Sequence, residues 1–226
     1  MTLRIRILTA AVASIGAGAI GLLAYGLVLQ AQAESLLKDV VALSVVNSTE
    51  SDVDRVVRDH RRFLVSHETN DGMVNTTFKV QNSWLARLKL EPPAEFRVAV
   101  VVKDGRVHHI SAGLFRYMDI YPTFGASAGF VDEYIEAPSY LSRGGHYAFP
   151  TPVGKPYLRV LLDSHATQDE RQRAFAFRFN CLVKPGSGCD LPCDYLPLAW
   201  QDYKNYVNST GLIFNQYYPK SGRCSR

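Results

Sequence analysis

An uninterrupted apolar segment near the N-terminus constrains this chain more than any other feature. From Ile7 to Leu29 the sequence reads ILTAAVASIGAGAIGLLAYGLVL and contains no charged side chain. As an α-helix this segment would rise about 34 Å, enough to cross a hydrocarbon core of about 30 Å. Soluble helices rarely lack a polar face over such a length. The sequence therefore predicts contact with a lipid bilayer through residues 7–29.

The charges beside this segment predict its orientation. Arg4 and Arg6 precede it, and no acidic residue does, so we expect residues 1–6 to be cytoplasmic and the C-terminal domain extracytoplasmic. The segment is longer than the apolar core of a signal peptide, about 7–15 residues, which favours an uncleaved single-pass anchor. The alternative is a secreted protein. Ala31-Gln32-Ala33 fits the small-x-small cleavage pattern, and cleavage there would make Glu34 the mature N-terminus.

Apolar residues keep helical spacing after the anchor. The stretch AESLLKDVVALSVV, residues 33–46, predicts that the membrane helix continues as a stiff helical stalk over residues 30–48. The remaining residues, 49–226, are enough for one domain with its own hydrophobic core. Thr49 with Asp52, and Thr167 with Glu170, have the spacing of helix starts, so a helix is expected after each threonine.

Between these helices the apolar period changes to two, which is typical of half-buried strands. Asp104-Gly105, between two apolar runs, predicts a hairpin of residues 96–102 and 106–111. Other predicted strands cover residues 73–81, 84–90, 130–136 and 157–162, and a short helix is expected over 200–207. The predicted fold class is α+β: a transmembrane helix and stalk, then one antiparallel sheet of about five strands packed by two or three helices.

The charge balance argues against a strongly anionic partner. The chain holds 25 Lys and Arg against 21 Asp and Glu, and two of the basic residues are Arg4 and Arg6. The rest of the chain is thus nearly neutral, whereas nucleic-acid-binding domains are strongly basic. We expect no nucleic-acid partner.

Four cysteines lie in the last fifth of the chain, at Cys181, Cys189, Cys193 and Cys224. An even number in an exported domain favours disulfides that staple its C-terminal part. Three pairings are possible, and the turn-forming sequence at residues 184–188 favours Cys181–Cys189 with Cys193–Cys224. A zinc site is the alternative, although the spacing differs from the short knuckles of structural zinc sites.

No motif for catalysis, metal or cofactor binding stands out. Asp163-Ser164-His165 holds the residue types of a hydrolase triad, but neighbours on an extended chain point to opposite faces. The same geometry separates the rings of His108 and His109, so they cannot share a metal. We therefore predict no catalytic residue, metal ligand or cofactor. The alternative function is a membrane-tethered or secreted hydrolase whose site includes Ser164 or His165 and residues distant in sequence.

Aromatic residues crowd a stretch that glycine, proline and serine interrupt. Aromatic side chains on such loops often form binding surfaces, although they also fill the core under long loops. The predicted function is a non-enzymatic binding or envelope-associated structural module with a protein or ligand partner at this loop. Its candidate ligand-binding residues are Tyr117, Tyr121, Phe124, Tyr140 and Tyr147.

Overall fold

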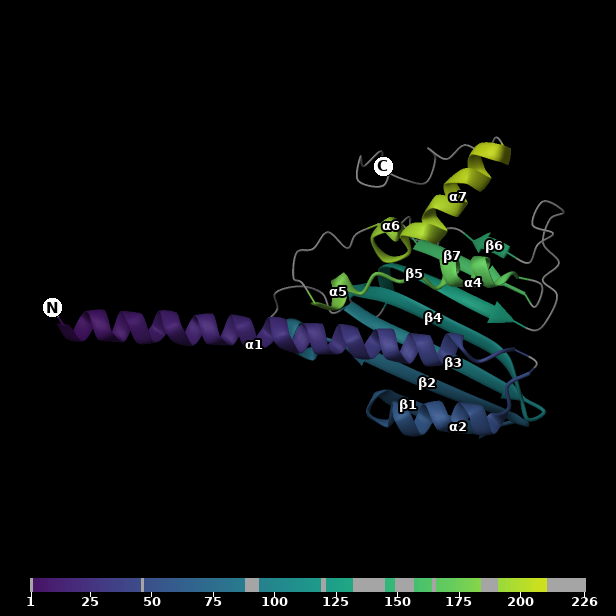
Figure 1. Ribbon diagram of the computed structural model, residues 1–226, viewed down its shortest axis with the longest axis horizontal. Coiled ribbons are helices and arrows are strands. Elements are labelled where there is room, and N and C mark those ends of the chain that lie inside the picture. The colour runs from purple at the N-terminus through teal and green to yellow at the C-terminus, as the bar shows by residue number, and fades with distance from the viewer. Residues whose placement is uncertain are drawn as a thin grey trace.

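A long helix lies across one face of a seven-stranded sheet and projects beyond it, as the computed structural model in Figure 1 shows. The structure describes residues 2–45, 47–87, 94–118, 121–131, 145–148, 157–163, 166–183 and 191–210. The helix, α1 (Thr2–Val41), is continuous over 40 residues. Its N-terminal half stands clear of the domain, and its C-terminal half packs on the sheet (Figure 1). The chain is α+β, as predicted.

The sheet is mixed, so the prediction of an antiparallel sheet is wrong in one respect. Neighbouring strands are antiparallel except β5 and β7, which pair in parallel. The reason is the strand order. β6 lies at the edge of the sheet and β7 lies between β5 and β6. β7 is antiparallel to β6 and therefore runs in the same direction as β5. The strands, in spatial order, are β1 (Leu64–Asn70), β2 (Met73–Gln81), β3 (Ala94–Lys103), β4 (Arg106–Met118), β5 (Tyr121–Val131), β7 (Tyr157–Leu162) and β6 (Gly145–Ala148).

Two Asp-Gly turns set the register of the first strands. The predicted hairpin at Asp104-Gly105 is confirmed, and Asp71-Gly72 makes the same kind of turn between β1 and β2. All four residues have positive φ, from 51° to 76°, as the tight turns of hairpins require. The predicted strand over residues 84–90 is wrong for residues 84–87, because α3 (Ser83–Arg87) is helical; residues 88–90 lie outside the described residues. Short apolar runs with mixed spacing are ambiguous between the two periods.

Both predicted helix starts are confirmed. α2 (Glu50–Asp59) follows Thr49, and α4 (Gln168–Ala174) follows Thr167. In α4 the Thr167 hydroxyl accepts a hydrogen bond from the Glu170 N–H at 3.2 Å, and the Glu170 carboxylate accepts one from the Thr167 N–H at 2.8 Å. The other helices are η1 (Arg61–Phe63), α5 (Asn180–Val183), α6 (Pro192–Tyr195) and α7 (Pro197–Thr210).

The core lies between the C-terminal half of α1 and one face of the sheet. Ala33, Leu36 and Val40 of α1 are completely buried, and Phe78 and Phe96 oppose them from β2 and β3. The prediction of a stalk over residues 30–48 is therefore corrected: the helix continues to Val41, as expected, but it is part of the domain. The spacing that suggested a stalk is an apolar helix face, and the sheet buries it.

Candidate membrane-facing site

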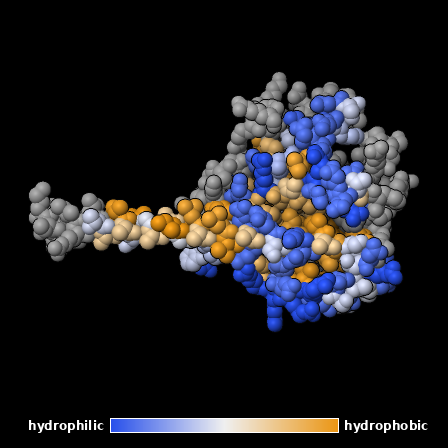
Figure 2. Space-filling model, in the orientation of Figure 1, coloured by the Kyte–Doolittle hydropathy of each residue, from blue (hydrophilic) through white to orange (hydrophobic). Residues whose placement is uncertain are grey.

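The projecting half of α1 is an exposed apolar surface. Val12, Ile15 and Ile20 are between 63% and 73% exposed, and Figure 2 shows this part of the helix as mainly hydrophobic. Soluble monomers rarely expose so long an apolar surface. Within the described residues, α1 is the one helix whose length and composition would let it cross a membrane, and a signal sequence has the same properties. The helix is thus compatible with a membrane anchor or a signal sequence.

Gly26 marks the level at which α1 first packs closely on the domain. A Cβ atom built on Gly26 would lie 3.1 Å from both Cα and Cγ1 of Val183 in α5, whereas one on Gly21 would have no neighbour within 4 Å. Only hydrogen fits comfortably at position 26. The absence of a side chain there lets the short helix α5 rest directly on the backbone of α1.

On the other side of α1, the apolar surface continues past this level. Tyr25, Leu27 and Val28 are 37%, 59% and 51% exposed, although the neighbouring Leu29 is buried in the core. One stretch of helix therefore faces the domain on one side and presents large apolar side chains on the other. If the hydrocarbon core of a bilayer covered Leu27 and Val28, its edge would lie at the level of α5, which contacts Gly26.

We call this part the proximal end: α3, α5 and the adjoining ends of β2, β3, β4 and β5. The side-chain amide of Asn82, which follows β2, donates a 2.8 Å hydrogen bond to the carbonyl oxygen of Leu182 and so ties α3 to α5. Within α3, Trp84 is 47% exposed, and the Arg87 guanidinium lies 5.6 Å from the centroid of its ring. Both residues fall in the stretch whose alternating pattern predicts a strand, so that pattern does not mark them as functional residues. The signal that could have found them is a tryptophan close to a basic residue.

The charges of the proximal end are arranged around one buried carboxylate. Glu95 is only 4% exposed, its carboxylate contacts the Arg97 guanidinium, and the Lys79 ammonium lies 3.9 Å away. The side chain of Arg97 is 51% exposed. The acidic group is thus covered and paired, while the guanidinium groups of Arg87 and Arg97 face solvent.

The structure brings together part of the predicted aromatic site. Tyr117 in β4 and Tyr121 and Phe124 in β5 belong to one hairpin, where Met118 opposes Tyr121 and residue 116 opposes Phe124. This hairpin ends at the proximal end. Tyr147 lies elsewhere, on edge strand β6 opposite Val160, and Tyr140 is outside the described residues. Ligand binding by these five residues stays a prediction.

Described aromatic rings also fill the core beneath the sheet. Phe96 lies in edge-to-face contact with Phe177 and Phe179, with ring centroids 5.6 Å and 4.8 Å apart. Because these rings are largely buried, they stabilise the packing of the segment before α5 on β3. They offer no surface for a partner.

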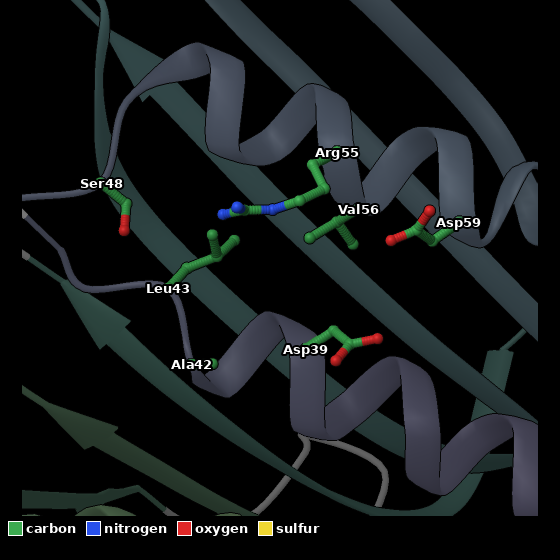
Figure 3. Close-up of a pocket in the computed structure, with 7 residues that line it drawn as sticks. All are labelled: Asp39, Ala42, Leu43, Ser48, Arg55, Val56 and Asp59. Atoms are coloured by element: carbon green, nitrogen blue, oxygen red, sulfur yellow. The ribbon is translucent and has the colours of Figure 1, made fainter.

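A polar cleft of about 280 Å³ separates α1 from α2 (Figure 3). Asp39 of α1 and Asp59 of α2 lie on its two sides, and the Arg55 side chain points from α2 toward Ser48. Asp39 already accepts a 2.8 Å hydrogen bond from His60, and Arg55 already binds Asp52 at 2.7 Å. The volume is below the range of about 300–1,000 Å³ that is typical of ligand sites. We assign no ligand to this cleft.

The described part of the chain assembles no catalytic or metal site. Asp163 is 2% exposed, and Ser164 and His165 lie outside the described residues. No group of three His, Cys, Asp or Glu among the described residues is placed to hold a metal ion. On β4, burial and then the charges of Arg159 and His108 lower the pKa of His109. That shift disfavours the imidazolium form in the folded state.

Two of the four cysteines lie among the described residues. Cys181 in α5 and Cys193 in α6 are disulfide-bonded, and neither is a free thiol. Cys189 and Cys224 lie outside the described residues. No cysteine pair is described, so the pairing stays a prediction.

No family model, curated protein or solved structure matches this chain. A fold alone does not define a function, so function is inferred below from the geometry of the described residues.

Proposed function

We propose that this chain is a single-pass, membrane-anchored extracytoplasmic module that binds a protein or ligand partner and is not an enzyme. Residues 7–29 are its anchor, and the α+β domain is its folded part. The observation that carries the proposal is the division of α1 into an exposed apolar half and a buried half without a break between them. A continuous helix transmits its direction to the domain, so the anchor sets the height and orientation of the domain above the bilayer.

The burial of Ala33 supports an anchor that is retained. Cleavage after Ala33 would remove Leu29 and Ala33 from the core, where they are 5% and 0% exposed. It would also remove the Gly26 contact with α5. Loss of this packing would expose apolar surface of the sheet to water. A mature chain that begins at Glu34 would therefore be less stable than the intact chain.

Two further observations support the proposed compartment. Arg4 and Arg6 before the apolar segment favour a cytoplasmic N-terminus. The disulfide-bonded state of Cys181 and Cys193 is typical of an oxidising, extracytoplasmic compartment. For the pairing, we propose Cys181–Cys189 with Cys193–Cys224, which mapping of non-reduced peptides tests directly.

Membrane fractionation combined with the intact mass tests the proposal. We expect the chain to resist alkaline extraction and to retain residues 1–33. Arginine at both Ile15 and Ile20 should release it, because a charge at the centre of a span costs about 2.5–3.5 kcal/mol on insertion scales. Val65→Arg is the matched control, since Val65 is 59% exposed but lies on β1. A soluble chain that begins at Glu34, or a reporter fusion that places the domain in the cytosol, would contradict the proposal.

A further inference from the structure

The proximal end has a feature that an anchor alone does not require: an exposed tryptophan beside an arginine. Trp84 is 47% exposed, and the Arg87 guanidinium lies over its ring. Tryptophan is enriched where proteins meet the lipid headgroups, because the ring is apolar while its N–H stays hydrated. Arginine beside it can lay its stem along apolar surface and keep its charged end among the phosphates. The pair has the chemistry of a membrane-interface contact.

The contacts of α1 with α5, and of α5 with Asn82, bring the start of α3 to the level at which the apolar segment ends. From Ile7 to Val28 the helix rises about 32 Å, which matches a hydrocarbon core of about 30 Å. On one side of α1 the apolar side chains of Leu27 and Val28 are exposed, and lipid would shield them from water. On the other side of α1, Gly26 contacts Val183. The edge of the hydrocarbon core therefore lies level with α5. The hydrogen bond from Asn82 to Leu182 holds the start of α3 beside α5.

The charges at this end favour an anionic surface. Glu95 is buried against Arg97 and Lys79, so its carboxylate is hidden from an approaching surface. Arg97 and Lys79 keep side-chain exposures of 51% and 39%. Where a bilayer surface carries anionic lipids, it attracts nearby basic residues, each by about fivefold in partition. Phosphate-bearing headgroups of anionic lipids are thus the partner whose chemistry fits.

We propose that the proximal end is a second membrane contact, in which Trp84 lies among the lipid headgroups and Arg87 binds the phosphate of an anionic lipid. The domain then rests against the bilayer, held by α1 and by α3. This inference rests on the proposed anchor, because α1 sets the height of α3. It goes beyond the anchor, since a domain joined to an anchor can equally stand away from the membrane.

Quenching of tryptophan fluorescence by brominated lipids tests the contact. The chain has two tryptophans, and Trp200 is only 4% exposed, so Trp200→Phe leaves Trp84 as the sole reporter. The full chain is reconstituted in phosphatidylcholine–phosphatidylglycerol vesicles with bromine near the headgroup or deep in the acyl chain. We expect Trp84 to be quenched more strongly by the shallow bromine. A distal reporter, T69W with both natural tryptophans changed to Phe, should not be quenched, because Thr69 lies next to the β1–β2 turn.

A third reporter separates failure of this inference from failure of the anchor. Ile15→Trp, again without the natural tryptophans, places the reporter on the exposed middle of the apolar segment. If deep bromine quenches this reporter while Trp84 is quenched no more than the distal reporter, the anchor holds and the second contact is refuted. If neither reporter is quenched, the anchor itself is refuted.

The role of Arg87 is tested in the same vesicles. Arg87→Gln should reduce the ratio of docked to undocked domain, read from Trp84 quenching, by about fivefold in anionic vesicles. Arg58→Gln on the exposed face of α2 is the matched control and should have no effect. Thermal unfolding checks that both exposed substitutions keep the fold. If Trp84 is quenched equally in the reporter chain that keeps Arg87 and in the one that carries Arg87→Gln, then Arg87 does not bind a lipid phosphate.

Discussion

Gly26 of α1 and Val183 of α5 approach so closely that a Cβ atom at position 26 would lie 3.1 Å from Cα and Cγ1 of Val183. This contact joins the apolar segment to the domain at the first point where the two meet. It also makes the anchor and the disulfide-bonded α5 one structural unit, since Cys181 lies in the same short helix. The Gly26 contact thus adds to the packing of Leu29 and Ala33 that holds the domain on α1.

Leucine at position 26 should destabilise the domain. Its side chain would overlap Val183 and force α5 away from α1, which we expect to cost about 1–3 kcal/mol. Gly21→Leu is the matched control, because a Cβ atom there meets nothing within 4 Å. Thermal and urea unfolding of the full chain in detergent would measure the stability of both variants. Equal stability of the two variants would contradict the close contact.

The hydrogen bond between His60 and Asp39 should hold α2 against α1. His60 is 7% exposed, and its Nε2 lies 2.8 Å from the Asp39 carboxylate. We expect His60→Ala to lower the free energy of unfolding by about 1–3 kcal/mol, since it removes a buried ring and its hydrogen bond to a carboxylate. Arg58→Ala, on the exposed face of the same helix, should change it by less than about 0.5 kcal/mol. If His60→Ala and Arg58→Ala lower the free energy of unfolding equally, the hydrogen bond between His60 and Asp39 does not stabilise the domain.

The cap of α4 should contribute measurably to stability. Loss of the Thr167 hydroxyl in Thr167→Ala removes the hydrogen bond from the Glu170 N–H, for which we expect about 1 kcal/mol. Thr167→Ser keeps a hydroxyl at the same place and should retain most of the stability. Urea unfolding curves of the two variants test this. The cap is unimportant if serine and alanine give the same midpoint.

Acidification should destabilise the folded domain through His109. Burial lowers the pKa of His109 below its usual 6.5, so the folded state binds a proton less readily than the unfolded chain does. Above pH 6.5 the residue is neutral in both states and contributes nothing. Below 6.5 the unfolded chain gains the proton first, and stability falls as the pH is lowered.

His109→Gln isolates this effect, because glutamine does not titrate. We expect the difference in melting temperature between the native chain and His109→Gln to change between pH 7.5 and pH 5.5, with the native chain losing more. His67→Gln, on exposed strand β1, is a control for a general histidine effect. If the melting temperatures of the native chain and of His109→Gln change equally between pH 7.5 and pH 5.5, the prediction is refuted.

Local patterns in the sequence predicted much of the local structure. The Asp104-Gly105 hairpin, the strand over 157–162 and the helix starts at Thr49 and Thr167 all depend on residues close together in the chain. Turn chemistry and capping act over a few residues, so they can be recognised without the fold. The strand predicted over 84–90 failed for the opposite reason. Its short apolar run fits both a helix and a strand, and α3 (Ser83–Arg87) is helical.

The apolar segment and its basic flank were determined by the sequence alone, because membrane-spanning potential depends only on length and composition. Only the tertiary structure decided that residues after Leu29 belong to the core and not to a stalk, since an apolar helix face looks the same whether it meets a sheet or another helix. The tertiary structure also brought Asn82, which comes just before Trp84 and Arg87 in the chain, to α5, and α5 touches Gly26 of the apolar segment. Asn82 and Leu182 are 100 residues apart, and no local pattern records such a contact.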